Sequence, residues 1–139
     1  MTQIDFYTHV ENKLHTACQL VAKAYERKLK VLIFTPDAAT SDAIDKLLWT
    51  STAIGFLPHA RADAELASET PIIIDHLAND RAHDEVLINL RSEWPPFFSQ
   101  FQRLIEIVSV DATDRAAARE RFRFYRDRGY PIESHNRSS

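Results

Sequence analysis

The stretch Lys30–Asp37, KVLIFTPD, decides the fold of this chain. Its first part, Val31–Phe34, is apolar at every position, and such a run is typical of a strand buried on both faces of a parallel sheet. The TPD that follows interrupts the run. A helix is then expected over Thr40–Trp49, with Thr40 or Ser41 as its N-cap.

Strand and helix patterns alternate on both sides of this stretch. We expect strands at Ile4–Tyr7, Pro71–Asp75 and Leu104–Val108, helices at Asn12–Lys28 and Asp111–Arg128, a short helix beginning at Pro95–Pro96, and either a strand or a helix at Val86–Leu90. This alternation predicts an α/β fold, with a Rossmann-like, mostly parallel sheet and helices on both faces. A loop is expected at 61–70. The sequence favours a single domain at residues 1–132, followed by a flexible tail at 133–139.

Composition and charge limit the classes of function. The chain has 139 residues, a net charge of −3 and one cysteine. A general nucleic-acid coat usually needs a basic surface, so that class is disfavoured. A single cysteine excludes an internal disulfide and suits a reducing cytoplasm. The opening residues, MTQIDFY, lack a signal-peptide pattern, and no apolar run reaches the roughly 18 residues of a membrane span.

The motifs of common chemistries are missing from the sequence. Phosphate-binding turns need glycines, yet the two glycines, Gly55 and Gly129, stand far from the first strand. We therefore predict no nucleotide-binding loop and no cofactor. Cys18 lies on the apolar stripe of the first helix, which indicates a buried thiol rather than a nucleophile. Histidines and aspartates gather in one polar stretch, where their spacing favours a solvated loop over a metal site: Asp75, His76, Asp80, His83 and Asp84.

An aromatic block follows the second predicted helix. It runs from Leu47 to His59, LLWTSTAIGFLPH, and places large apolar side chains where a short polar connection is usual. Leu48 fits the core. Trp49 and the Phe56–Pro58 run fit a buried cover for the sheet and an interface anchor equally well, because aromatic residues beside a proline are typical of hydrophobic interfaces.

The predicted C-terminal helix has two different faces. Its basic stripe lies within about 100° of the helix circumference and contains Arg115, Arg119, Phe122, Arg123 and Arg126. The opposite face is a plausible core face and contains Ala117, Ala118, Phe124 and Tyr125. The stripe fits an ordinary solvated face or a site for an acidic peptide that ends in a phenylalanine carboxylate, since guanidinium groups pair with carboxylates.

Several pieces of the sequence, in this order, resemble the chi subunit of bacterial DNA polymerase III holoenzyme. They are TQIDFY, KVLIFTPD, DKLLW followed by GFLPH, DEVLINLR and ARERFRFYRDRGY. The resemblance spans roughly residues 1 to 130 and implies a Rossmann-like fold without a nucleotide. It also implies that the chain does not catalyse a reaction itself and serves as an accessory subunit of the clamp loader. Two partners are implied: the psi subunit, in a heterodimer, and the acidic C-terminal tail of single-stranded-DNA-binding protein.

The resemblance also implies residues for each partner. For psi these are Trp49, Phe56, Leu57, Pro58 and His59; for the tail they are Val108, Arg115, Arg119, Phe122 and Arg123. Arg115 and Arg123 stand where lysines are familiar, and Phe122 stands where a tyrosine is familiar. No catalytic residue, metal, membrane contact or strong direct binding of nucleic acid is expected. Two alternatives stay open: a direct single-stranded-DNA binder that uses Phe122 and the arginines, and an α/β enzyme with His59 or His76 as base.

Overall fold

The elements of the chain alternate between strand and helix, as the sequence predicts. The computed structural model describes residues 1–50, 58–61, 70–77 and 83–137. In chain order the elements are β1 (Gln3–Val10), α1 (Lys13–Glu26), β2 (Val31–Phe34), α2 (Ala38–Thr50), β3 (His59–Arg61), β4 (Ile72–Asp75), β5 (Val86–Asn89), the 3₁₀ helix η2 (Phe98–Gln100), β6 (Arg103–Ser109), α3 (Ala112–Asp127) and β7 (Ile132–Asn136).

The strands of this described part form one parallel sheet. Its seven strands lie in the order β3-β4-β2-β5-β6-β1-β7, and every adjacent pair is parallel. Strand β2 lies between β4 and β5, so that Val31 pairs with Ile72 on one side and with Val86 on the other. The stretch KVLIFTPD therefore supplies an inner strand, which explains why all four residues of β2 are buried.

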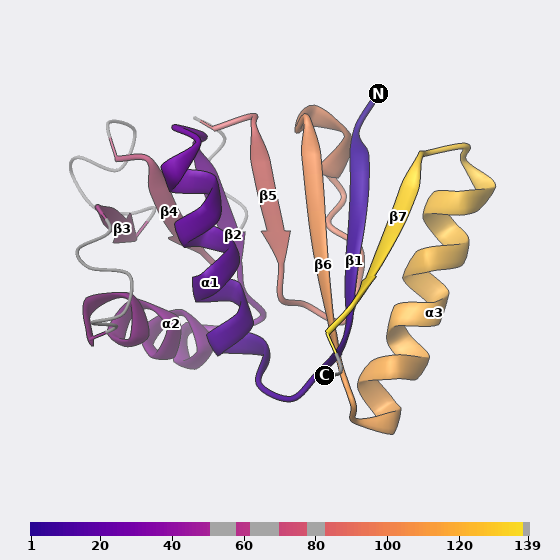
Figure 1. Ribbon diagram of the computed structural model, residues 1–139, viewed down its shortest axis with the longest axis horizontal. Helices are drawn as coiled ribbons and strands as arrows, with labels where there is room; N and C mark the ends of the chain where they lie inside the picture. The colour runs from indigo at the N-terminus through magenta and orange to yellow at the C-terminus, as the bar shows by residue number, and fades with distance from the viewer. Residues whose placement is uncertain (51–57, 62–69, 78–82, 138–139) are drawn as a thin grey trace.

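Helices cover both faces of the sheet, which confirms the predicted α/β architecture. The two apolar layers alternate along β2: Val31 and Ile33 join the layer under α1 and α2, while Leu32 and Phe34 join the layer under α3 and η2. In Figure 1, α1 lies in front of the β2 half of the sheet and α3 runs beside the β7 edge. The sheet thus packs against α1 and α2 on one face and against α3 and η2 on the other.

Two expectations about the strands need correction or completion, and one strand was not expected. The open choice at Val86–Leu90 resolves to a strand, β5. The predicted tail from Glu133 is wrong for residues 133–136, because β7 pairs in parallel with β1, with Ile4 opposite Ile132. The sequence of β7 is mostly polar, so it did not predict a strand. An edge strand with one solvated face needs few apolar residues. The short strand β3 was not expected either.

The helix termini follow local hydrogen bonding. The predicted N-cap of α2, Thr40 or Ser41, is wrong: Asp37 Oδ1 accepts a hydrogen bond from the Thr40 backbone N–H at 2.7 Å. Hydrogen bonding from the Thr40 side chain and from its backbone N–H lowers the pKa of Asp37 below its ordinary value. Helix α3 begins after Asp111, whose side chain accepts from the Asp114 N–H. It ends before Gly129, which takes the left-handed conformation with φ of 82°.

A buried ionic cluster attaches α3 to the sheet. Arg121 is 1% exposed and Glu106 is fully buried. Arg121 Nε donates to Glu106 Oε1 at 3.0 Å, the Tyr125 hydroxyl donates to Glu106 Oε2 at 2.6 Å, and Asn89 Nδ2 donates to both carboxylate oxygens. Burial raises the pKa of Glu106, although the charge of Arg121 and these hydrogen bonds oppose that rise. The cluster fixes the rotation of α3 about its own axis.

Candidate functional site: a cationic cavity with an aromatic wall

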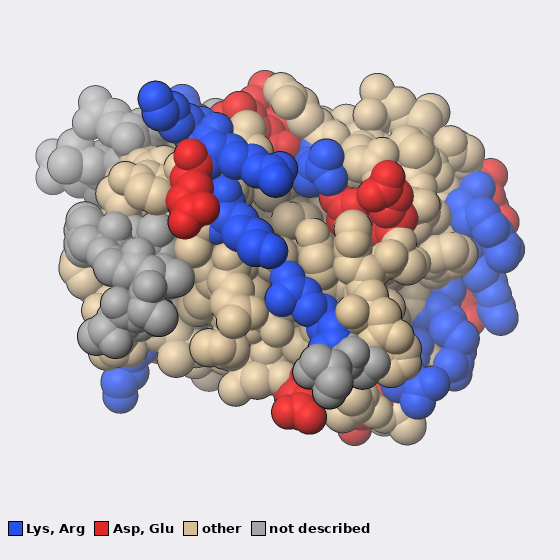
Figure 2. Space-filling view, viewed as in Figure 1, with Lys and Arg blue, Asp and Glu red and all other residues tan. Residues whose placement is uncertain are grey.

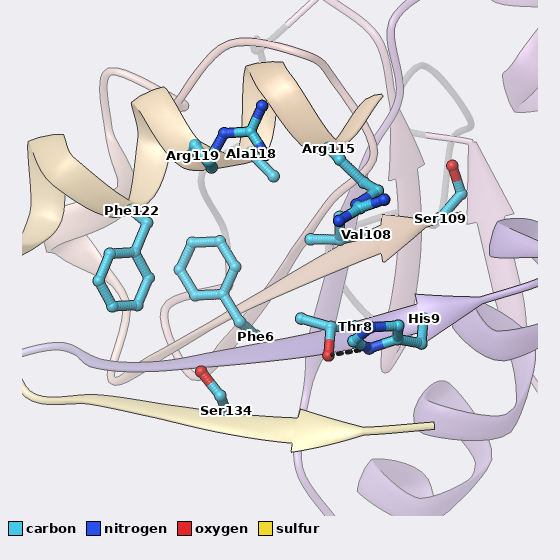
Figure 3. Close-up of a pocket in the computed structure, with 10 residues that line it drawn as sticks. All are labelled: Phe6, Thr8, His9, Val108, Ser109, Arg115, Ala118, Arg119, Phe122 and Ser134. Atoms are coloured by element: carbon cyan, nitrogen blue, oxygen red, sulfur yellow. Dashed lines mark hydrogen bonds between the residues drawn. The ribbon is translucent and has the colours of Figure 1, made fainter. Parts of the chain in front are cut away.

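A cavity of about 230 Å³ opens between α3 and the last residues of β1 and β6 (Figure 3). Parallel α/β sheets commonly bind ligands near the carboxyl ends of their strands. Four elements line the cavity, with Phe6, Thr8 and His9 from β1, Val108 and Ser109 from β6, Arg115, Ala118, Arg119 and Phe122 from α3, and Ser134 from β7.

Two arginines give the cavity its charge. Arg115 and Arg119 lie one turn apart on α3 and line the same cavity, as neighbours at this spacing do. Neither forms an ion pair with a carboxylate among the described residues. The acid next to Arg115 in sequence, Asp114, accepts hydrogen bonds from the Ser109 N–H at 2.7 Å and from Lys13 at 3.1 Å. The two guanidinium groups therefore remain available to an anion.

The other wall of the cavity is apolar and aromatic. Phe122 is half-buried and its ring lies 5.4 Å from that of Phe6, at an interplanar angle of 59°. Val108 and Ala118 are buried and complete the wall. Figure 3 shows both phenylalanine rings on one side of the cavity and Arg115 directed from α3 toward Val108. A ligand with a carboxylate beside an apolar ring would satisfy both parts of this surface.

The structure brings together four of the five residues predicted for the tail site. Val108, Arg115, Arg119 and Phe122 all line the cavity. Arg123 lies outside the lining, and its guanidinium donates to Glu120 Oε1 at 3.0 Å on the exposed surface of α3. Helical spacing alone did not separate Arg123 from the others. The basic stripe covers an arc of about 100° around α3, and only part of that arc faces the cavity.

The residues from β1 and β7 were missed in the sequence. Alternation along β1 places Phe6 and Thr8 on one face of the sheet. The alternation does not indicate which helix packs against that face. Ser134 was not predicted as a site residue because the strand that carries it, β7, was not predicted. His9 has a positive φ of 60°, and its Nδ1 lies 3.0 Å from the Thr8 hydroxyl. The strained backbone turns His9 toward the cavity rim.

The aromatic block is visible only in part. Trp49 is 59% exposed, whereas Leu48 is buried as expected. The Trp49 ring lies 4.7 Å from the His59 ring, and His59 Nε2 lies 3.2 Å from Asp45 Oδ1. Pro58 is half-buried beside them, while Phe56 and Leu57 lie outside the described residues. The structure thus joins Trp49 and His59 in one corner, with an indole exposed at the surface.

The other candidate groups are buried or pair with neighbouring side chains. Cys18 is buried, and burial raises the pKa of its thiol to about 11, as expected for a core thiol. His83 is not solvated as predicted but buried, with Nε2 2.7 Å from the Thr70 carbonyl; Asp80 lies outside the described residues. Among the described residues, one group has ligand atoms close enough to hold a metal, namely Asp5, Glu133 and His135. Asp5 already pairs there with Arg103 and His135.

The fold and the cavity define a doubly wound α/β domain with a cavity under α3 that is lined by two arginines and an aromatic wall. The chain belongs to the family described as DNA polymerase III chi subunit, HolC, whose sequence model matches residues 1–133. None of the helices in the described ranges is long and apolar enough to span a membrane.

Three curated relatives carry the name DNA polymerase III subunit chi. The one from Pseudomonas aeruginosa is 34% identical over 139 residues, which cover 97% of this chain and 96% of that protein. The one from Haemophilus influenzae is 32% identical over 136 residues, with 94% of each chain covered. The one from Escherichia coli is 25% identical over 134 residues, which cover 96% of this chain and 89% of that protein. The resemblance inferred from the sequence is confirmed.

Proposed function

We propose that this chain is a non-catalytic accessory subunit of the DNA polymerase III clamp loader in the bacterial cytoplasm. It bridges the psi subunit and the acidic C-terminal tail of single-stranded-DNA-binding protein, and it requires no cofactor. The bridge would act by tethering, since two linked weak contacts raise the effective concentration of the clamp loader near single-stranded DNA.

One observation carries the tail-binding half of this proposal. The cavity under α3 combines two guanidinium groups without ion-pair partners among the described carboxylates with the ring wall of Phe6 and Phe122. An acidic peptide that ends in phenylalanine offers a terminal carboxylate, further negative charge and an aromatic side chain. Because the cavity is open to solvent, the ionic part of the binding is screened by salt, and we expect micromolar affinity.

The decisive experiment measures the fluorescence anisotropy of a labelled acidic peptide ending Asp-Phe-Pro-Phe. We expect saturable binding to the natural protein, weaker at higher salt, and a loss of about tenfold or more in Arg119→Ala, which removes one charge-assisted hydrogen bond donor. Arg126→Ala is the matched control, because Arg126 lies on the same helix outside the cavity and pairs with Asp127. Equal losses in both variants would contradict a site at the cavity.

Two peptide variants separate the parts of the site. Amidation of the C-terminal carboxylate removes the charge that Arg115 or Arg119 would bind, and replacement of the last phenylalanine by alanine removes the ring that Phe122 would contact. Each change should weaken binding to the natural protein. The amidated peptide should also bind Arg119→Ala and the natural protein more equally, since the partner of the guanidinium is then missing.

The psi-binding half of the proposal is carried by the exposed Trp49 beside His59. A large indole with 59% of its surface exposed and a firmly packed neighbour is typical of an interface anchor. Trp49→Ala should prevent co-purification with a psi subunit while leaving binding of the tail peptide unchanged. A variant that retains psi would place the psi contact elsewhere on the surface.

A further inference from the structure

A second basic groove lies on the opposite face of the sheet from the cavity under α3. We name it the α1-face groove; it has a volume of about 160 Å³ and lies between α1 and strands β1 and β6. Its lining includes Asp5, Tyr7, Lys23, Arg27 and Arg103. Phe6 faces the α3 cavity whereas Asp5 and Tyr7 face this groove, because successive residues of a strand point to opposite faces.

Three cationic side chains line this groove, and a fourth lies over the ring of Tyr7, which also lines it. Lys23 and Arg27 lie one turn apart at the end of α1, and Arg103 begins β6. Arg137, which follows β7, places its guanidinium 5.1 Å from the centre of the Tyr7 ring. In Figure 2 a line of Lys and Arg atoms crosses the face that α1 occupies in Figure 1 and ends near the C-terminus.

The acids of this face leave most of these cations uncompensated. The Asp5 carboxylate is buried, and Arg103 and His135 pair with it. Glu133 lies beside Asp5 in the adjacent strand β7. Among the described carboxylates, none forms an ion pair with Lys23, Arg27 or Arg137. A row of free cations from separate elements suits an extended anion better than a single ion.

An aromatic stack adjoins the row of cations. The Tyr7 and His135 rings lie 4.5 Å apart with an interplanar angle of 17°, and the His135 side chain is 39% exposed. Asp and Glu side chains carry no ring that could stack on this surface. A nucleic-acid base can stack on an exposed ring beside a cation, and this combination is typical of single-strand binding sites.

The geometry points to the α1-face groove as a contact site for single-stranded nucleic acid. The phosphates would lie along Lys23, Arg27 and Arg137, and a base would stack on His135. With only a few phosphate contacts the affinity of the free chain is weak, which agrees with its net charge of −3. The inference does not depend on the tail cavity, which lies on the other face of the sheet.

A titration of labelled oligothymidylate at low salt tests the inference through fluorescence anisotropy. The double variant Arg27→Ala/Arg137→Ala should weaken binding by at least about tenfold and should reduce the slope of log affinity against log salt by about 1.4, which corresponds to two phosphate contacts on a single strand. Circular dichroism confirms that the variant is folded. An unchanged affinity or slope would overturn the proposal.

Two further measurements distinguish the groove from other sites. Arg119→Ala is the matched control on the α3 face; if it weakens oligothymidylate binding as much as the double variant does, the nucleic acid lies in the α3 cavity and the proposal fails. His135→Ala should weaken binding and His135→Phe should restore it through stacking. An oligoglutamate of equal charge should compete poorly; equal competition would identify the groove as a surface for acidic protein segments and would also overturn the proposal.

Discussion

The two faces of α3 place two arginines in opposite surroundings. Arg121 points inward, is 1% exposed and pairs with the buried carboxylate of Glu106. Arg119, two residues earlier, is exposed at the rim of a solvent-accessible cavity. The same type of residue therefore anchors the helix on one face, as Arg121, and offers a free charge on the other, as Arg119. The difference shows that burial and partner, rather than residue type, decide what an arginine contributes.

The largest expected effect lies on the inner face. Arg121→Ala should lower the free energy of unfolding by about 3–5 kcal/mol, because it leaves the Glu106 carboxylate buried without its cation. Urea denaturation followed by circular dichroism measures this change. Arg119→Ala is the control and should change stability by less than about 0.5 kcal/mol. Similar stabilities for the two variants would erase the proposed difference between the faces.

Phe122 lies at the boundary between the faces and should show both kinds of effect. Its ring is half-buried against Phe6 and also lines the cavity. Phe122→Ala should cost about 2 kcal/mol of stability, less than a fully buried phenylalanine, and should also weaken binding of the acidic peptide. Phe122→Tyr retains the ring and should preserve both properties. Loss of stability without loss of peptide binding would make Phe122 a core residue only.

Asp114 tests how firmly the start of α3 is attached. Its carboxylate accepts from the Ser109 N–H and from Lys13, and these hydrogen bonds, with the charge of Lys13, hold its pKa below the ordinary value despite partial burial. A lowered pKa means that the native state binds fewer protons, so the stabilisation is present at neutral pH and is lost as pH falls through the native pKa. Asp114→Asn should cost about 1 kcal/mol at pH 7, and the difference from the natural protein should shrink in acid. Urea titrations across pH measure it; a difference that is constant with pH would rule out this origin.

The sequence predicted the inner strands and the three helices because their signals are local and strong. Val31–Phe34 and Ile72–Ile74 are uniformly apolar, and α3 carries an N-cap and a terminal glycine. The strand β7 was missed, because an edge strand shows polar residues to solvent and its pairing with β1 is a long-range contact. Arg121 was missed because arginine usually marks a solvated face.

Part of the cavity was predicted because some of its residues are related by a local pattern. Arg115, Arg119 and Phe122 share one helix, so their proximity follows from helical spacing. Phe6 and Ser134 belong to strands whose neighbours could not be deduced without the sheet order. From residue spacing alone, a site assembled between elements is predictable only for the element that supplies several of its residues. Val108 of β6 was assigned through the family resemblance instead.

Arg115→Lys is the substitution from which we expect the smallest effect. It compares the roles of Arg115 and Arg119, which both lie on the outer face of α3. A lysine retains the positive charge but loses the planar pair of donors that a guanidinium offers to a carboxylate. If Arg115 acts as a general positive charge for an acidic segment, the variant should bind the tail peptide within about threefold of the natural protein at low salt, with unchanged stability. Anisotropy titrations of Arg115→Lys and Arg119→Lys measure the difference. A loss for Arg115→Lys as large as that for Arg119→Ala would instead assign the paired carboxylate contact to Arg115, and would move the terminal carboxylate of the peptide toward Val108 and the end of β6.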